Sequence, residues 1–179
     1  MKKNIIYIVL LALVATVFLV PGLKDTIKEQ FLPVATIENA VHIAPADYDV
    51  DLQGINVPST NLKNFKDKVV FLNFWGTWCP PCIKEWPSIQ KLYDAKKDKI
   101  DFVLIAMKDD EAKVRKFLKE NNYNVPVYFA QSPISEKILP KAFPTTFLLD
   151  DKGRILLKED AFKDWMSPSS LEFVNTLIK

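Results

Sequence analysis

Two short, mostly apolar runs, 69–74 and 101–106, are the clearest pattern in the chain. Runs of this length without regular polar alternation are typical of strands buried on both faces of a sheet. Between them, apolar side chains recur at the spacing of one buried helix face. These side chains are Cys82, Trp86, Ile89 and Tyr93. The pattern therefore predicts a strand, a helix over 80–95 and a second strand parallel to the first.

The rest of the domain continues this alternation of helices and strands. Helical spacing is predicted over 111–121 and 169–178, and strands are predicted over 127–130, 145–149 and 154–157. Residues 150–153 end in Gly153 and predict a hairpin turn between the last two strands. Residues 49–54 and 55–58 alternate around Gly54 and predict a small N-terminal hairpin. Together the elements predict an α/β fold with a mixed central sheet and helices on both faces.

The N-terminus carries a different pattern. Lys2 and Lys3 precede an apolar run over residues 5–20, which only Thr16 interrupts. The run is slightly too long for the core of a signal peptide, and no Ala-x-Ala cleavage site follows it. We therefore expect an uncleaved signal anchor over residues 1–23 rather than a removed signal peptide. A tether over 24–46 and one domain over 47–179 would follow, and the leading lysines would place that domain outside the cytoplasm.

Charge narrows the class of partner. The formal charge is +2, from 24 basic and 22 acidic residues, and Lys2 and Lys3 account for the excess. Removing those two leaves 22 basic against 22 acidic residues, so the remainder is neutral, which argues against a nucleic-acid partner. Lysines scattered among acids over 91–99 indicate a solvated face. His42, the only histidine, lies in the predicted tether and indicates a solvated side chain.

The only two cysteines, Cys79 and Cys82, stand at the predicted start of the helix over 80–95. The first turn of a helix has free N–H groups and partial positive charge, which stabilise the thiolate that attacks disulfides. Cys82 belongs to the buried face, so we expect Cys79 to be exposed. A structural zinc site needs four ligands, and the chain offers two thiols and the distant His42. The remaining alternatives are a redox-active dithiol and a permanent structural disulfide.

Several separated motifs resemble one family. The sequence Trp78-Cys79-Pro80-Pro81-Cys82, followed by Pro87, and the later Phe143-Pro144-Thr145 resemble thioredoxin-fold proteins. Four further features narrow the resemblance. They are the N-terminal anchor, the sequence of residues 68–78, Glu85 three positions after Cys82, and a strand–helix insertion over about 101–130. From about residue 47 to the C-terminus, the chain is similar to the TlpA/ResA-like disulfide reductases, which implies a three-layer thioredoxin-like fold with that insertion.

The resemblance also implies roles for individual residues. Five residues would contact the substrate: Trp78, Pro80, Phe143, Pro144 and Thr145. A cis bond before Pro144 would turn the Phe143 backbone toward the sulfurs. Trp75 and Trp78 would form an apolar rim, although Trp75 also fits plain core packing. Glu85 would exchange a proton with the dithiol. Its alternative is an exposed helical glutamate paired with a lysine. Asn73 stands where thioredoxins carry a buried aspartate, which favours Glu85 as the proton acceptor.

These implications predict a membrane-anchored, extracytoplasmic thiol–disulfide reductase. Cys79 would attack a protein disulfide and Cys82 would resolve the mixed disulfide. Family members often serve cytochrome c maturation, so apocytochrome c is one candidate substrate. The chain has no nicotinamide or flavin signature, so we expect no cofactor beyond the Cys79–Cys82 disulfide, no metal, and a membrane dithiol carrier as electron donor. Pro80 and Pro81 remove N–H groups that would stabilise the thiolate, which favours a reducing dithiol.

Three other functions share parts of this pattern. A disulfide oxidase or isomerase would use the same motif at a higher reduction potential. A peroxidase on this fold would have Thr three residues before its cysteine, whereas Gly76 occupies that position. A non-enzymatic copper carrier would resemble the Sco proteins, which use wider cysteine spacing and a later histidine. No histidine follows His42.

Overall fold

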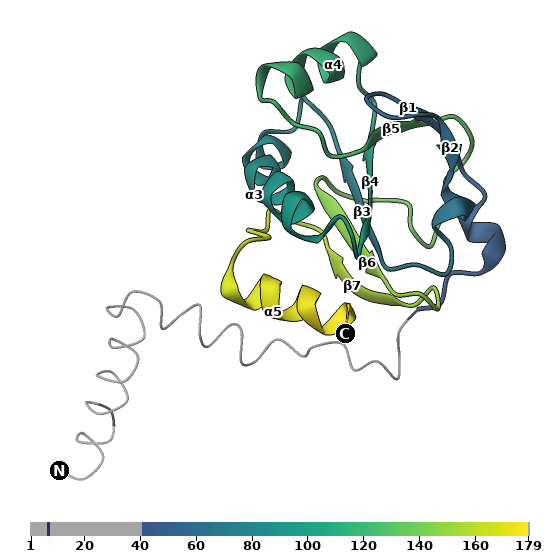
Figure 1. Cartoon of the computed structure of the whole chain (residues 1–179), viewed down its shortest axis with the longest axis vertical. Helices are drawn as coiled ribbons and strands as arrows, with labels where there is room; N and C mark the ends of the chain where they lie inside the picture. Colours follow the sequence, from purple (N-terminus) through teal and green to yellow (C-terminus); the bar gives the residue numbers. More distant parts are fainter. Residues whose placement is uncertain (1–6, 8–40, 179) are drawn as a thin grey trace. The chain divides into compact units, whose positions relative to one another are not determined.

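The two apolar runs pair in parallel at the centre of one sheet. In the computed structural model, which describes Tyr7 and residues 41–178, β3 (Val70–Trp75) pairs with β4 (Asp101–Ala106). Every residue of β3 is buried, as expected for a strand covered on both faces. Within the described residues, seven strands form the sheet in the order β2-β1-β5-β4-β3-β6-β7 (Figure 1).

Apart from β2, η2 and η3, which were not predicted, the other elements lie close to their predicted positions. The remaining strands are β1 (Asp51–Gly54), β2 (Thr60–Asn61), β5 (Val127–Ala130), β6 (Thr145–Leu149) and β7 (Ile155–Glu159). The helices are α3 (Pro80–Lys96), α4 (Glu111–Glu120) and α5 (Pro168–Leu177), with short 3-10 helices η2 (Pro45–Tyr48) and η3 (Leu62–Phe65). β4 and β5 also pair in parallel, whereas β6, β7, β1 and β2 make antiparallel pairs. The predicted mixed sheet is confirmed.

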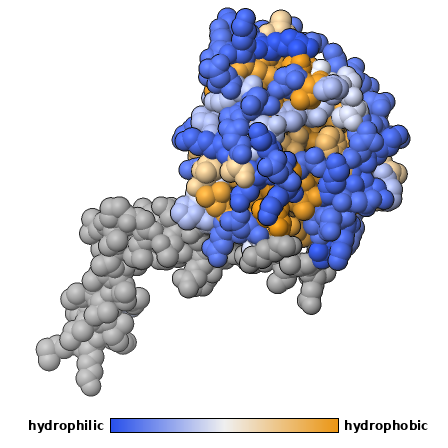
Figure 2. All heavy atoms as spheres, viewed as in Figure 1, coloured by the Kyte–Doolittle hydropathy of each residue, from blue (hydrophilic) through white to orange (hydrophobic). Residues whose placement is uncertain are grey.

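Helices lie on both faces of the sheet, but α3, α4 and α5 share one of them. Side chains of α3, α4 and α5 pack in one core cluster, and residues around η2 and η3 pack in a second cluster on the opposite face (Figure 1). Both right-handed crossovers, β3–α3–β4 and β4–α4–β5, step in the same direction along the sheet, so their helices fall on the same face. On the face shown in Figure 2, hydrophilic side chains predominate and apolar ones show in a central band.

The N-terminal hairpin differs from its prediction. β1 pairs with β2 at residues 60–61 and, on its other side, with β5, whereas residues 55–58 form a loop. The side chain of Asn56 holds this loop, because its amide donates to the Val125 carbonyl and its Oδ1 accepts from the Val127 N–H. Pro58 also lacks the N–H that a strand partner would need.

The described domain begins before residue 47. His42 makes an isolated antiparallel bridge with Arg154, and the Ile43 N–H donates to the Gly153 carbonyl over 2.9 Å. The Ile43 side chain is 5% exposed and belongs to the second core cluster. Residues 41–46, assigned to the tether from the sequence, therefore pack as part of the domain.

The predicted anchor over residues 5–20 lies outside the described residues, apart from Tyr7. In the part of the chain that the structure describes, no helix is long and apolar enough to span a bilayer. The anchor and the remainder of the tether stay predictions.

Ile43→Ala tests whether residues 41–46 belong to the folded unit. We expect the free energy of unfolding to fall by about 2–4 kcal/mol, because the change removes a buried aliphatic side chain. Val41→Ala is the matched control, since Val41 is 55% exposed, and it should change stability by less than about 0.5 kcal/mol. Chemical denaturation measures both values. Equal effects of the two changes would contradict the assignment.

Candidate redox site

The two cysteines form a disulfide at the first turn of α3. Cys79 is the N-cap of the helix, and its Cα lies 5.3 Å from that of Cys82. Pro80 and Pro81 occupy the first two helical positions and have no N–H, so Cys82 supplies the first backbone donor. That N–H points at Cys79 Sγ over 3.3 Å. When the pair is reduced, the same donor and the helix dipole would stabilise negative charge on Cys79.

The exposure predicted for Cys79 is wrong. Cys79 is 3% exposed and Cys82 is 1% exposed, and both belong to the core cluster on the α-helical face of the sheet. Cys79 Sγ is bonded to Sγ of the buried Cys82, so both residues lie in the core cluster. The position of each sulfur in the helix, rather than unequal exposure, therefore distinguishes the two cysteines.

The antiparallel pairing of β6 with β3 brings the late proline to this end of β3. β6 runs antiparallel to β3, and Thr145 lies opposite Phe74, so residues 143–144 stand beside the turn that leads to Cys79. The Phe143–Pro144 bond is cis, as predicted. The Phe143 ring meets the Trp78 ring edge-on with centroids 5.3 Å apart.

The predicted contact residues have different exposures. Trp78 is 49% exposed and Pro80 is exposed, whereas Phe143 is half-buried and Pro144 and Thr145 are buried. The Thr145 hydroxyl contacts the Ala142 carbonyl and Asp160 Oδ1. Trp75 is 1% exposed and packs edge-on against Trp86, so it belongs to the core rather than to a rim.

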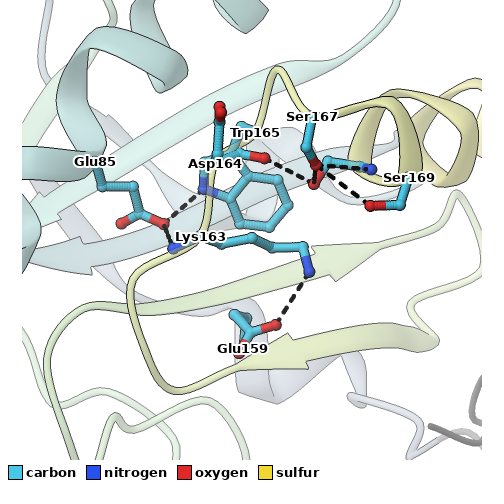
Figure 3. A network of polar contacts seen from close by, with 8 residues as sticks. Glu85, Glu159, Lys163, Asp164, Trp165, Ser167 and Ser169 are labelled. Atoms are coloured by element: carbon cyan, nitrogen blue, oxygen red, sulfur yellow. Dashed lines mark hydrogen bonds and ion pairs between the residues drawn. The ribbon is translucent and has the colours of Figure 1, made fainter. Parts of the chain in front are cut away.

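Glu85 is buried one turn beyond Cys82, so its alternative as an exposed, lysine-paired residue is wrong. Its side chain is 1% exposed. Glu85 Oε1 accepts from Trp165 Nε1 over 2.6 Å and from the Lys163 N–H over 3.3 Å (Figure 3). Glu85 Oε2 is buried and has no hydrogen-bond partner among the described residues. A proton on Oε2 would leave the carboxyl neutral in this apolar setting.

Burial is the main reason that the pKa of Glu85 is raised, to about 7. The hydrogen bonds from Trp165 and Lys163 oppose the shift, while the Glu159 carboxylate adds to it. Figure 3 shows the Lys163 side chain turned toward Glu159, and the two charged atoms are 3.3 Å apart. Glu85 therefore changes protonation near neutral pH, which is what a proton acceptor for a thiol requires.

Trp165 is the site residue that sequence reasoning missed. It is fully buried. Its backbone N–H donates to Ser88 Oγ over 3.2 Å, and its ring packs edge-on against the Phe71 ring, with the centroids 4.8 Å apart. Eighty residues separate it from Glu85. No spacing signal in the sequence links positions that far apart, so only the folded chain shows this contact.

Asn73, in β3, occupies the position at which thioredoxins carry a buried aspartate, so this position offers no carboxyl group. It is fully buried, and its Nδ2 donates to Thr146 Oγ1 over 2.8 Å. Among the described residues, no group of three or more His, Cys, Asp and Glu side chains is arranged to hold a metal.

Comparison with known proteins gives a consistent set of relatives. The Redoxin family model matches residues 44–171. "Thiol-disulfide oxidoreductase ResA" of Bacillus thuringiensis subsp. konkukian is 36% identical over 117 residues, covering 63% of this chain and 65% of that protein. ResA of Bacillus subtilis is 31% identical over 124 residues, covering 65% and 69%. The match thus spans just under two thirds of the length of the first of these relatives.

Solved structures share the fold. A putative thiol:disulfide interchange protein DsbE from Chlorobium tepidum superposes with a TM-score of 0.62 at 24% identity, covering 72% of this chain and 92% of that one. StoA from Bacillus subtilis superposes with a TM-score of 0.54 at 25% identity, covering 72% and 95%. The thioredoxin-like fold that the motifs imply is confirmed.

The raised pKa of Glu85 predicts a pH-dependent stability. The folded protein holds this proton more tightly than the unfolded chain, so the stabilisation is complete below pH 4.5 and is lost as the pH rises through about 7. Between about pH 4 and pH 8, the stability of the wild type relative to Glu85→Gln should fall by about 3 kcal/mol. Denaturation of the oxidised protein across this range measures the difference.

Glu120→Gln serves as the control for this measurement, because the Glu120 side chain is 61% exposed. Subtracting the free energy of unfolding of Glu85→Gln from that of the wild type at each pH removes the contribution of every other titrating group. A wild-type-to-variant difference that is constant from acid to alkaline pH would contradict the assignment of a raised pKa to Glu85.

Proposed function

The chain belongs to the Redoxin family and, within it, to the ResA-like thiol–disulfide oxidoreductases, and from this premise we propose that it reduces protein disulfides outside the cytoplasm. One observation carries the proposal. A disulfide at the first turn of α3 stands on the same helix as a buried carboxyl whose pKa is about 7. A merely structural cross-link has no need of a proton acceptor one helical turn away.

The proposed reaction transfers two electrons in two exchange steps. In the reduced protein, the Cys79 thiolate attacks one sulfur of the substrate disulfide and releases the other as a thiolate. Cys82 then loses its proton, attacks Cys79 Sγ, and releases the second substrate sulfur. Substrate is reduced to a dithiol, and Cys79 and Cys82 are left oxidised. Glu85 is the proposed acceptor of the Cys82 proton.

The surroundings of the disulfide favour a protein substrate. Trp78 is 49% exposed and its ring contacts the half-buried Phe143 beside the cis proline, so these two side chains offer a protein partner an aromatic edge. The Phe143 backbone beside Pro144 can pair with an extended segment, and this kind of contact tolerates many sequences. We assign substrate contact to Trp78, Pro80 and Phe143, and to the backbone around Pro144 and Thr145, whose side chains are buried. Phe162, 39% exposed, adds an aromatic surface on the loop that contacts Glu85.

The direction of transfer and the partners complete the proposal. Two prolines at the start of α3 leave a single backbone N–H on Cys79 Sγ, which favours a reducing dithiol. We propose a signal anchor over residues 5–20, exported proteins including apocytochrome c as substrates, and a membrane dithiol carrier as donor. Val41 and His42 pair beside the turn over residues 150–153, which lies at the opposite end of β6 from Thr145.

Two alternatives use the same fold. A disulfide oxidase or isomerase would share the motif and differ in reduction potential, and a potential above about −150 mV, toward the strong oxidants, would favour it. A copper carrier would need a third ligand near the cysteines. His42, the only histidine, pairs with Arg154 at the opposite end of β6 from Thr145, which counts against this function.

Cys82→Ala is expected to trap substrates. Without the resolving thiol, the mixed disulfide at Cys79 cannot be cleaved, so the full-length variant in its native membrane should accumulate covalent complexes. Non-reducing electrophoresis followed by mass spectrometry identifies the captured proteins. Cys79→Ala, which keeps the other thiol, should trap far less. Equal trapping by both variants, or none by either, would argue against the proposed reaction.

Glu85→Gln is expected to slow resolution of the mixed disulfide by about a hundredfold or more, the contribution typical of a positioned proton acceptor. Stopped-flow mixing of the reduced protein with insulin, over about pH 5 to 9, measures this step and should show the wild-type inflection near pH 7 disappear. Trp165→Phe removes the donor to Glu85 Oε1, so it should move that inflection to higher pH. An unchanged profile in both variants would remove Glu85 from the mechanism.

A further inference from the structure

The turn that leads into Cys79 is held by one neighbouring loop. The register of β3 and β4 places Trp75 opposite Ala106, so the residues after each strand lie side by side. The Met107 N–H donates to the Trp75 carbonyl over 2.8 Å, and Trp78 Nε1 donates to the Met107 carbonyl over 3.0 Å. The β4–α4 loop thus continues the pairing beyond the carboxyl ends of β3 and β4, and it contacts the turn that leads into Cys79.

Asp109 supplies the strongest of these contacts. Its Oδ2 accepts from the Thr77 N–H over 2.5 Å, and its Oδ1 accepts from the Thr77 hydroxyl over 2.8 Å. Hydrogen bonds to an ionised acceptor are stronger than those between neutral groups, and two from one residue also fix orientation. Thr77 stands two residues before Cys79, and the Cys79 N–H closes the turn on the Gly76 carbonyl.

The backbone conformation of this loop is unusual. Lys108, between Met107 and Asp109, has a φ of 50°, in the left-handed region that side-chain-bearing residues seldom adopt. Such a conformation persists only where surrounding contacts impose it, and it often marks a functional position. Here it allows the Met107 carbonyl and the Asp109 carboxylate to face the same turn.

The turn itself fits tightly around the Trp78 indole. A Cβ at Gly76 would lie 2.4 Å from Trp78 Nε1 and 2.8 Å from Cε2, so the indole lies back over the bare glycine. From there its exposed ring meets Phe143 beside the cis proline. The contact of Asp109 with Thr77 therefore fixes the residue immediately before an exposed aromatic side chain at the disulfide.

We propose that Asp109 is a positioning residue that presents Trp78 and the Cys79 turn to protein substrates. It touches neither the sulfurs nor the substrate and acts through Thr77. This inference rests on the proposed function, since it assigns a docking role within that reaction. A substrate large enough to use the Trp78 surface should depend on Asp109, whereas a small disulfide that needs only the sulfurs should not.

Asp109→Ala in the full-length protein tests this role with two probes. With insulin as substrate, KM should rise about tenfold while kcat changes by less than about twofold, because docking and not sulfur exchange is impaired. The rate with bis(2-hydroxyethyl) disulfide should stay within about twofold of wild type. Thr77→Val, which removes only the hydroxyl contact, should raise KM for insulin about threefold, and it should add little in the double variant.

Asp110→Asn is the matched control, since it removes the same charge one residue away from the contact. Asp110 caps α4 through the Lys113 N–H, and Asn caps helices equally well, so KM should change less than about twofold. Equal losses with both disulfides in Asp109→Ala, or the same rise in KM in Asp110→Asn, would overturn the proposal.

Activity of the wild type with the two disulfides distinguishes failure of the proposed function from failure of this inference. If it reduces neither disulfide, the proposed function fails. Amide exchange at Thr77, measured by NMR, still reports on the contact in that case, because protection should be lost in Asp109→Ala and kept in Asp110→Asn. Retained protection in Asp109→Ala would show that Asp109 does not hold the turn.

Discussion

Burial of β3 is the constraint on which the rest of the structure depends. A strand covered on both faces and paired on both sides has one register available, and its carboxyl end is therefore fixed in space. Three loops meet that end: the turn to Cys79, the β4–α4 loop and the loop that carries Pro144. None of them is adjacent to the others in sequence, and the two sides of β3 bring them together.

The same constraint produces the chemistry of Glu85. α3 starts where β3 ends, so its buried face carries Cys82, Glu85 and Trp86 against the sheet. A carboxyl on that face loses water, and among the described residues two donors, Trp165 Nε1 and the Lys163 N–H, compensate on one of its oxygens. Desolvation exceeds these hydrogen bonds, so the carboxyl is held near its midpoint at neutral pH. The cost of burying it is consistent with a functional rather than a stabilising role.

Burial of both cysteines affects access to the disulfide. Cys79 is 3% exposed in the disulfide form, so the partner that reduces this disulfide has to dock beside it. Trp78 and Phe143 form the edge at which docking would occur, and Asp109 and Asp160 hold the threonines beside that edge, Thr77 and Thr145. Substrate docking and thiol–disulfide exchange would therefore both depend on loops that these hydrogen bonds hold in place.

Local patterns in the sequence established most of the elements, though not β2, and the candidate reacting groups. Apolar runs defined β3 and β4, helical spacing defined α3, and the cysteine motif with Phe143-Pro144-Thr145 identified the family, because these signals are local. Tertiary structure alone decided the burial of Cys79, the partner of β1, the packing of Ile43 and the contacts of Glu85 with Trp165 and of Asp109 with Thr77. Each of these depends on residues far apart in the chain, and the register of the sheet, which no local pattern encodes, determines which of them meet.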